Sequence, residues 1–375
     1  MPQVVGQPAP AGTGLLGAAS CADATHCWAV GVAGPNADTT ATTAGAPVTV
    51  ITATTDGGLN WAAEPLTLPF TPELTGIACP TLELCIAVGS TGTGLSNGTV
   101  LTTHDGGATW SQASVPTGAF DLNSVTCMTA AVCTAIVNDG TNSWSAQTDD
   151  FGGSWAEDGD LPTGFEDPRD LSCRAADDAT GAITCLVAGY SPTSTGHGQG
   201  AIAVSQNGGI SWTAADVPSG VGVLQNVTCQ TPTACIAVGT TSTTVSDVVP
   251  AKGQVLLSAD DGQTWALSPT PTPVDDIFGV ACPTALTCAV VGTVWRGPPG
   301  VGTGSVAQSE DGGTTFTRLT SAYVPLTLTA ISCPSASLCV AVGGDSVARI
   351  ALTPPSVPKV AGPTGPEHLA PRSTR

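Results

Sequence analysis

Residues 79–110 read CPTLELCIAVGSTGTGLSNGTVLTTHDGGATW, and they contain the two signals that decide the fold. The first is a pair of cysteines separated by five residues; the second is a box that runs from a threonine through an aspartate and two glycines to a tryptophan. Seven such cysteine pairs occur along the 375 residues, and a box follows six of them. The first cysteines of successive pairs lie 46 to 58 residues apart, a period typical of propeller blades and helical solenoids. The chain is therefore predicted to be a tandem array of one supersecondary unit.

Every cysteine belongs to a pair. Six pairs are spaced C-x5-C and one C-x11-C: Cys21/Cys27, Cys79/Cys85, Cys127/Cys133, Cys173/Cys185, Cys229/Cys235, Cys282/Cys288 and Cys333/Cys339. An even count at short, recurring spacing predicts disulfides within each repeat and an oxidising compartment. Zinc is the weaker alternative, because C-x5-C is not the usual ligand spacing and the four histidines do not recur with the pairs. We expect no metal site and no cofactor.

One repeat contains four short apolar or alternating runs, at residues 74–79, 85–88, 99–103 and 109–113, with no helical periodicity. This pattern predicts a four-stranded antiparallel meander. The cysteines should end the first strand and begin the second, so that the disulfide clamps the hairpin between them.

The boxes span residues 54–61, 103–110, 148–155, 205–212, 258–265 and 309–316. In each, we expect an acceptor side chain to bind backbone N–H groups in the turn between strands three and four: Asp56, Asp105, Asp150, Asn207, Asp260 and Asp311. The glycines permit positive φ, and the box aromatic is expected in the core of its blade.

At these residues the chain resembles the Asp-box (BNR) family, whose S/T-x-D-x-G-x-x-W hairpins occur in sialidases, sortilin-type receptors, some xyloglucan-cleaving glycosidases and photosystem II stability/assembly factors. The resemblance covers residues 15 to 353. It implies a β-propeller with the boxes at the blade periphery, on the face opposite the ligand site. It therefore also implies a structural role for the six box acceptors.

The seventh repeat has a cysteine pair and a third strand near residues 347–352, but it lacks a box and a fourth strand. Residues 4–21 align without gaps on residues 212–229, so Val4 occupies the position of Trp212. Since a ring must join its ends or leave open edges, we expect the N-terminal strand to complete the last blade. The prediction is an all-β, seven-bladed propeller over residues 1–353, followed by a Pro-rich disordered tail or linker at 354–375. A six-bladed ring with an extra hairpin is the alternative, and it would leave both ends unpaired.

The charge of the chain excludes one class of partner. It has 29 acidic and 9 basic residues, a formal charge of −20, which repels the phosphates of nucleic acids. No apolar run approaches the ~20 residues of a transmembrane helix. The disulfides predict a secreted or extracellular protein, although MPQVVGQPAP at the start has neither the basic nor the apolar region of a signal peptide. We expect that such a signal was removed or that the start was placed too late, and that the protein is a monomer.

The connections between strands two and three and the links between blades should lie on one face, opposite the boxes. We call this the loop face and expect the functional residues there, at the mouth of the channel. The links, which include Glu64, are acidic, and the candidates for ligand binding are Trp295, Arg296, Tyr190, Arg169, Asp170, Asp275 and Asp276. Solvated surface charge is the simpler interpretation of the acidic residues. Trp295 with Arg296 is suited to stack on a sugar ring or to hold a carboxylate.

The sialidases of the Asp-box family resemble one another in an arginine triad, a tyrosine–glutamate pair and an F/Y-R-I-P motif. Here that motif is absent, and residues 1–353 contain only five arginines and two tyrosines. We therefore predict a non-catalytic binding or scaffold module that recognises a polysaccharide or a cell-surface protein. The alternative is a glycoside hydrolase that uses two carboxylates, for which Asp275, Asp276 and Asp170 are available.

Overall fold

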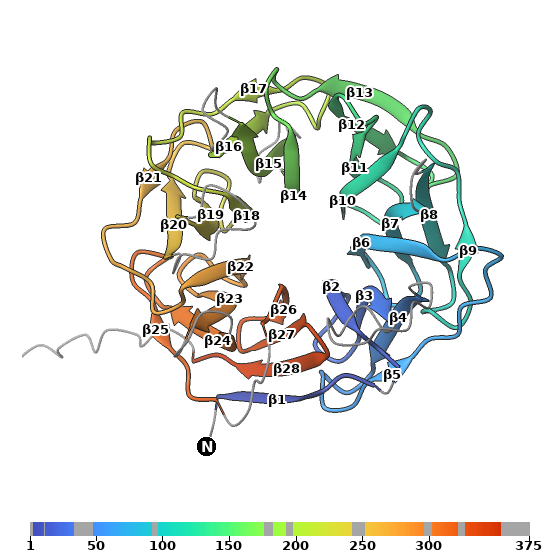
Figure 1. Ribbon diagram of the computed structural model, residues 1–375, viewed down its shortest axis with the longest axis horizontal. Helices are drawn as coiled ribbons and strands as arrows, with labels where there is room; N and C mark the ends of the chain where they lie inside the picture. Colours follow the sequence, from blue (N-terminus) through green and yellow to red (C-terminus); the bar gives the residue numbers. More distant parts are fainter. Residues whose placement is uncertain are drawn as a thin grey trace, which may run out of the picture.

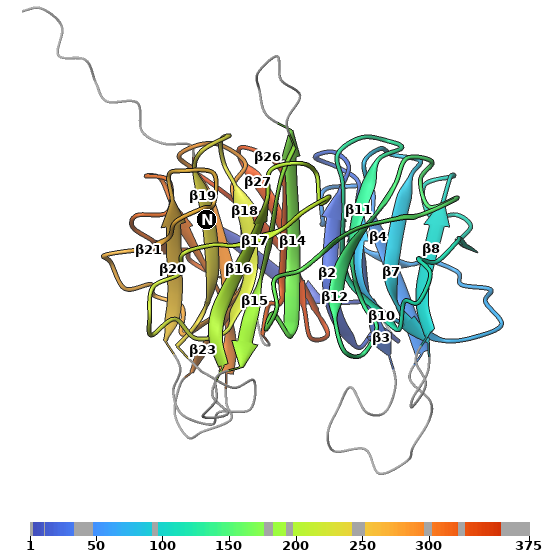
Figure 2. The same ribbon diagram turned by 90° about the horizontal axis from the view of Figure 1, so that it is seen from above.

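The computed structural model describes residues 3–10, 12–33, 48–91, 97–175, 183–192, 198–241, 252–295, 302–321 and 327–353. Its strands form seven separate sheets of four antiparallel strands each. Figure 1 shows the sheets arranged as the blades of a ring, and Figure 2 shows the strands running between the two faces of that ring. The described residues contain no helix. The predicted seven-bladed, all-β propeller is confirmed; the tail predicted at 354–375 lies outside the described residues.

Each blade is a meander whose first strand lies innermost (Figure 1). Blades 1 to 4 consist of β2 (Leu15–Cys21), β3 (Cys27–Ala33), β4 (Val48–Thr54) and β5 (Ala62–Ala63); β6 (Pro72–Ala78), β7 (Cys85–Thr91), β8 (Asn97–Thr103) and β9 (Ser111–Gln112); β10 (Asp121–Cys127), β11 (Cys133–Asn138), β12 (Ser143–Thr148) and β13 (Ala156–Asp160); and β14 (Asp167–Ala175), β15 (Ile183–Pro192), β16 (Gly198–Ser205) and β17 (Thr213–Ala214). Blades 5 to 7 consist of β18 (Leu224–Cys229), β19 (Cys235–Thr240), β20 (Gly253–Ser258) and β21 (Ala266–Leu267); β22 (Asp276–Ala281), β23 (Cys288–Trp295), β24 (Gly302–Ser309) and β25 (Thr317–Arg318); and β26 (Ala330–Ser335), β27 (Leu338–Gly343), β28 (Ser346–Ala351) and β1 (Val4–Pro8).

The N-terminal strand closes the ring, as the alignment of the chain ends predicts. β1 pairs with β28 in antiparallel register, from Val4 opposite Ile350 to Pro8 opposite Ser346. Val4 is completely buried, in a cluster that includes Ile350 and Leu352. The strand therefore contributes both ladder hydrogen bonds and a core side chain to blade 7.

The hydrophobic core consists of seven clusters, and each lies between two neighbouring blades. The box aromatics belong to these clusters: Trp110 of blade 2, for example, packs in one cluster with Trp28 and Ile51 of blade 1. The same cluster contains Leu101 of blade 2, so the box aromatic does enter the core of its own blade, and that core is shared with the preceding blade. The box turn also contacts the preceding blade directly, because the indole N–H of Trp28 donates to the carbonyl of Gly106 in the box of blade 2 (3.2 Å).

All fourteen cysteines form the seven predicted disulfides, each across the hairpin of strands one and two with Cα atoms 3.9 to 4.1 Å apart. The bonds join Cys21 to Cys27, Cys79 to Cys85, Cys127 to Cys133, Cys173 to Cys185, Cys229 to Cys235, Cys282 to Cys288 and Cys333 to Cys339. The pairing inferred from the repeat is therefore confirmed in every blade.

The second cysteine does not begin its strand in two blades, so the predicted strand start is wrong at Cys185 and at Cys339. In blade 4, β15 begins at Ile183, before Cys185, and in blade 7, β27 begins at Leu338, before Cys339. The reason is that the antiparallel ladder continues past these two disulfides, with Ala175 opposite Ile183 and Ser335 opposite Leu338. The longer C-x11-C spacing of blade 4 leaves room for the extra pairs, and blade 7 gains its pair through a shift in register. The prediction holds for Cys27, Cys85, Cys133, Cys235 and Cys288.

Each box docks on the disulfide loop of its own repeat. In all six, the backbone N–H that follows the acceptor donates to the carbonyl two residues before the second cysteine, at 2.9 to 3.0 Å, as from Gly57 to Thr25. The donating residue has a positive φ in every box, which glycine adopts without strain. Phe151 and Asp261 occupy the same conformation at φ 57° and 64°.

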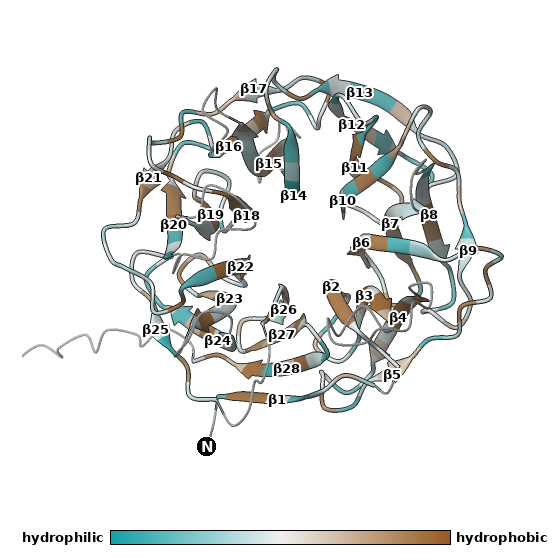
Figure 3. Cartoon of the chain, in the orientation of Figure 1, coloured by the Kyte–Doolittle hydropathy of each residue, from teal (hydrophilic) through white to brown (hydrophobic). Residues whose placement is uncertain are grey.

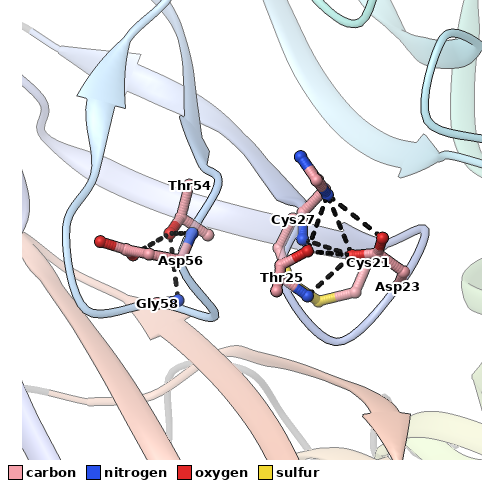
Figure 4. A network of polar contacts seen from close by, with 8 residues as sticks. Cys21, Asp23, Thr25, Cys27, Thr54, Asp56 and Gly58 are labelled. Carbon is pink, nitrogen blue, oxygen red and sulfur yellow. Dashed lines mark hydrogen bonds and ion pairs between the residues drawn. A yellow bond between two sulfur atoms is a disulfide. The ribbon is translucent and has the colours of Figure 1, made fainter.

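Figure 4 shows the hydrogen bonds among Thr54, Asp56 and Gly58 of the first box, together with the Cys21–Cys27 loop. The Thr54 hydroxyl donates to Asp56 Oδ1 (2.9 Å) and accepts the backbone N–H of Gly58 (3.0 Å). Asp56 Oδ1 also accepts the backbone N–H of Asn60 (2.8 Å), and Oδ2 accepts its side-chain amide (2.7 Å). These bonds, above all that from the Asn60 side chain, lower the pKa of Asp56 to about 2. Asp56 therefore accepts backbone N–H groups of the turn, from Leu59 and Asn60, in the way that the sequence predicts for a box acceptor.

Candidate functional site

The two faces of the ring follow from the antiparallel meander. The disulfide hairpins and the boxes join strands one to two and three to four, so they lie at one end of every blade. The connections from strand two to three and the links between blades lie at the other end, on the loop face. Among the predicted site residues, three meet there although they are separated in the sequence: Trp295 with Asp275 and Asp276.

Trp295 is the last residue of β23, and its backbone and side chain are both fixed. Its backbone N–H donates to Asp275 Oδ2 (2.8 Å), and its indole N–H donates to Asp276 Oδ2 (2.6 Å). On β24 it faces Gly302, where an added Cβ would lie 3.2 Å from the indole. The side chain is nevertheless 40% exposed. The loop face therefore holds an oriented aromatic surface at the rim of blade 6.

The remaining loop-face candidates lie in blade 4 or outside the described residues. Tyr190 lies opposite Asp167 in the β14–β15 pair, and Arg169 forms an ion pair with the Asp167 carboxylate. No hydrogen bond between described residues joins this group to Trp295. Arg296, the predicted partner of Trp295, lies outside the described residues.

Asp170 does not lie on the loop face, so that prediction is wrong. It is a residue of β14, the innermost strand of blade 4, because in this repeat the strand begins at Asp167 and the acidic residues after it belong to the strand rather than to the link. Asp170 Oδ2 accepts hydrogen bonds from the Asn226 side chain (2.8 Å) and the Val227 backbone (3.0 Å), both on β18. The carboxylate therefore bridges blades 4 and 5 in the wall of the channel.

The pocket beside Asp170 has a volume of about 290 Å³ and lies between the inner strands β14, β18, β22 and β26. Asp170 is partly accessible from this pocket, yet protein atoms surround it densely. Burial is the main reason that its pKa is raised to about 6, against the opposing effect of its hydrogen bonds. The sequence pattern missed this pocket, although the position of Asp170 three residues before Cys173 places it on an inner strand.

Two other acidic residues, Asp121 and Glu64, have surroundings that differ from those of Asp275 and Asp276. Asp121 is the first residue of β10, and burial, together with the charge of Glu73, raises its pKa. Glu64 is predicted on the loop face, but it lies beside the box of blade 2, where burial and the charge of Asp105 raise its pKa. The link after β5 therefore begins on the box side of the ring, and Glu64 is removed from the candidate site.

Within the described ranges, no group of three or more His, Cys, Asp or Glu residues is placed to hold a metal ion. A search of the same residues finds no helix that is both long and apolar enough to span a membrane.

Comparison with known proteins supports the fold. No protein-family model matches the chain, and no curated protein matches it by sequence. Among solved structures, YCF48 bound to D1 peptide is 18% identical over 96% of this chain and 98% of its own, with a TM-score of 0.64. The GH74 xyloglucanase from Xanthomonas campestris is 16% identical over 90% of this chain and 52% of its own (TM-score 0.60), and a streptogramin B lyase is 9% identical over 93% and 97% (TM-score 0.60). The names of these proteins indicate different functions, so the likeness establishes the propeller and leaves the function to the site.

Proposed function

We propose that the chain is a secreted, non-catalytic binding module of the Asp-box type, which recognises a polysaccharide or a cell-surface protein through its loop face. The observation that carries the proposal is Trp295, a residue that is 40% exposed although Asp275 accepts its backbone N–H and Asp276 accepts its indole N–H. Exposed, pre-oriented aromatic side chains lose little conformational entropy when a partner covers them, and they dominate many interfaces.

Two further observations support this function. The seven disulfides are suited to an oxidising, extracellular environment. YCF48, whose structure resembles this one, has been solved bound to D1 peptide, which gives a precedent for recognition of a peptide by a protein of this fold.

Glycoside hydrolysis is the second candidate, since the xyloglucanase shares the fold. A two-carboxylate glycosidase needs one acid with a raised pKa and a second carboxylate at a suitable distance across the scissile bond. Asp170 has the raised pKa, but it lies in the channel wall. Asp275 and Asp276 each already accept a hydrogen bond from Trp295. These engaged carboxylates favour binding over catalysis.

The test is Trp295→Ala in a screen of glycans and cell-surface proteins, run beside a hydrolysis assay on sialosides and β-glucans. We expect binding of the ligand found in the screen to weaken by about 1 to 3 kcal/mol, as for a desolvated aromatic anchor, with unchanged melting. Phe120→Ala is the matched control, because Phe120 is 38% exposed in the link before β10 and no side-chain hydrogen bond orients it. Equal losses in both variants would contradict the anchor, and turnover of either substrate would favour the hydrolase.

A further inference from the structure

The inner strands of the seven blades differ at one equivalent position, three residues before the first cysteine. In four blades this residue is alanine or glycine, and in blades 3, 4 and 5 it is polar: Ala18, Gly76, Ser124, Asp170, Asn226, Gly279 and Ala330. Four blades therefore pack against the next blade without a polar side chain at this position, so the fold does not require a polar residue there. A buried carboxylate that breaks the repeat at a cost in desolvation indicates another role.

The three polar residues form a ladder across neighbouring blades. The Ser124 hydroxyl accepts the backbone N–H of Leu171 (3.3 Å), Asp170 Oδ2 accepts that of Val227 (3.0 Å), and Asn226 Oδ1 accepts that of Val280 (3.0 Å). Each acceptor thus bonds the equivalent amide of the next blade. Because serine and the neutral amide of Asn226 make the same bridge, bridging does not explain why residue 170 carries a charge.

Burial and hydrogen bonds, and no charged side chain, set the pKa of Asp170. Of the two arginines on β14, Arg169 directly precedes Asp170 and pairs with Asp167, and Arg174 lies four residues further along the strand. Of the strands packed against β14, β11 and β18 carry no charged residue, β15 carries the titratable Tyr190, and β10 carries Asp121 at its start. In Figure 3, β14 is drawn largely in hydrophilic colours, whereas β2 across the ring is mostly hydrophobic. The carboxylate therefore stands in the channel wall without a counter-ion among the described residues.

One oxygen of the Asp170 carboxylate can accept further hydrogen bonds. Both short contacts of Asp170 are made by Oδ2, whereas the contact of Oδ1 with the Ser124 hydroxyl is longer, at 3.5 Å. The backbone N–H of Leu171 also lies close enough to lower the pKa of the carboxyl. The pocket that this side chain lines is also lined by the hydroxyl residues Ser172, Thr228 and Ser332. An anionic acceptor beside several hydroxyls matches a ligand that presents several N–H donors and a positive charge.

We propose that this channel pocket binds a small organic cation, with an ammonium or guanidinium group that donates to Asp170 Oδ1. The surrounding hydroxyls accept its remaining N–H groups. A volume of about 290 Å³ accommodates a compact amine, and the charge of −20 on the whole chain attracts cations toward the ring. The site lies on the channel wall and is independent of Trp295.

The test uses putrescine and methylguanidine as probes, with uncharged 1,4-butanediol as the isostere, in calorimetric titrations and ligand-detected NMR of the full chain near neutral pH. We expect the two cations to bind, butanediol not to bind, and Asp170→Asn to weaken binding at least tenfold. Asp149→Asn is the control, since it removes the same charge from an exposed position. Because Asn226 makes the equivalent bridge with an amide, Asp170→Asn should stay folded, which a thermal melt checks.

The proposal also predicts that protonation of Asp170 releases the cation. The carboxyl 13C signal of Asp170 should titrate at lower pH with a probe present than without it, and binding should weaken as pH falls through the titration of the free carboxyl. Binding that is equal in Asp170→Asn and the parent protein would overturn the proposal. So would binding of butanediol as strong as that of putrescine, or the absence of any cation binding at millimolar concentration.

Discussion

At the scale of single residues, each box depends on a hydroxyl as much as on its acid. The Thr or Ser that opens the box is buried in all six repeats, and its oxygen donates to the acceptor while it accepts the N–H of the glycine four residues on, as Thr103 does for Gly107 (2.9 Å). A polar residue before the aromatic completes the network, and sequence reasoning overlooked it: Asn60, Thr109, Ser154, Ser211, Thr264 and Thr315. A polar residue recurs at this position in every box, and this recurrence was the signal in the sequence that could have identified its role.

Two threonines on β8 test this role of the hydroxyl. Thr103→Val leaves the buried N–H of Gly107 without its acceptor, so we expect a loss of about 1 to 3 kcal/mol in unfolding free energy, measured by denaturant titration. Thr99 is equally buried, but its hydroxyl has no partner among the described residues. Thr99→Val should therefore be neutral or stabilising. A similar loss in both variants would mean that packing, and not the box hydrogen bonds, sets the cost.

At the scale of elements, the chain ends replace the box that blade 7 lacks. The backbone N–H groups of Gln3 and Val4 donate to the Thr320 carbonyl of blade 6 (3.0 Å each), and the Gln308 side chain of β24 bonds the backbone of Thr353. On the other side of blade 7, the Gln7 side chain donates to the carbonyls of the first box. Strand β1 thus ties blade 7 to both of its neighbours.

Adjacent valines of β1 allow a matched test of ring closure. Val4 is 0% exposed and Val5 is 46% exposed. Val4→Ala should cost about 2 kcal/mol, since it removes roughly two buried methylene equivalents at about 0.8 kcal/mol each plus a cavity contribution. Val5→Ala should stay within about 0.5 kcal/mol, as is usual for surface substitutions. Thermal unfolding of both variants measures the difference, and equal melting temperatures would show that β1 does not close the fold.

The sequence predicts the elements better than it predicts the site, for a physical reason. Spacing between cysteines and boxes fixes which strands pair, so the blades, the disulfides and closure by Val4 could be inferred. It does not by itself show where a strand begins, and for that reason the pattern misplaces the start of β15 at Cys185 and assigns Asp170 to a link. In the β22–β23 pair, Asp276 lies opposite Thr293, so extending the strand from Cys288 by residue number would have placed Trp295 near Asp276. The hydrogen bond from the indole depends on side-chain geometry, which no sequence pattern contains.

At the scale of the whole molecule, two sets of carboxylates give stability opposite dependences on pH. Hydrogen bonds lower the pKa of the box aspartates, to about 2 for Asp56 and in the same direction for Asp105, Asp150, Asp260 and Asp311. Their contribution is present above their ordinary pKa of 3.8 and is lost as pH falls toward the folded value. Asp170, with its pKa raised from 3.8 to about 6, stabilises the fold below pH 3.8, and that contribution is lost as pH rises through 6.

The two dependences can be separated with Asp170→Asn. Between pH 4 and 6 the folded parent protein holds a proton on Asp170 that the unfolded chain has released, so its stability should fall as pH rises, by on the order of 3 kcal/mol in total. The variant lacks the Asp170 carboxyl and keeps only the decline due to other groups with a raised pKa, such as Asp121 and Glu64, so its stability should fall less over this range. Both proteins should lose stability together below pH 4 as the boxes protonate. Denaturant unfolding from pH 3 to pH 8 measures the free energy of unfolding across both pH dependences. A parent profile that matches the variant between pH 4 and 6 would show that the buried carboxylate is better solvated through the channel than its surroundings imply.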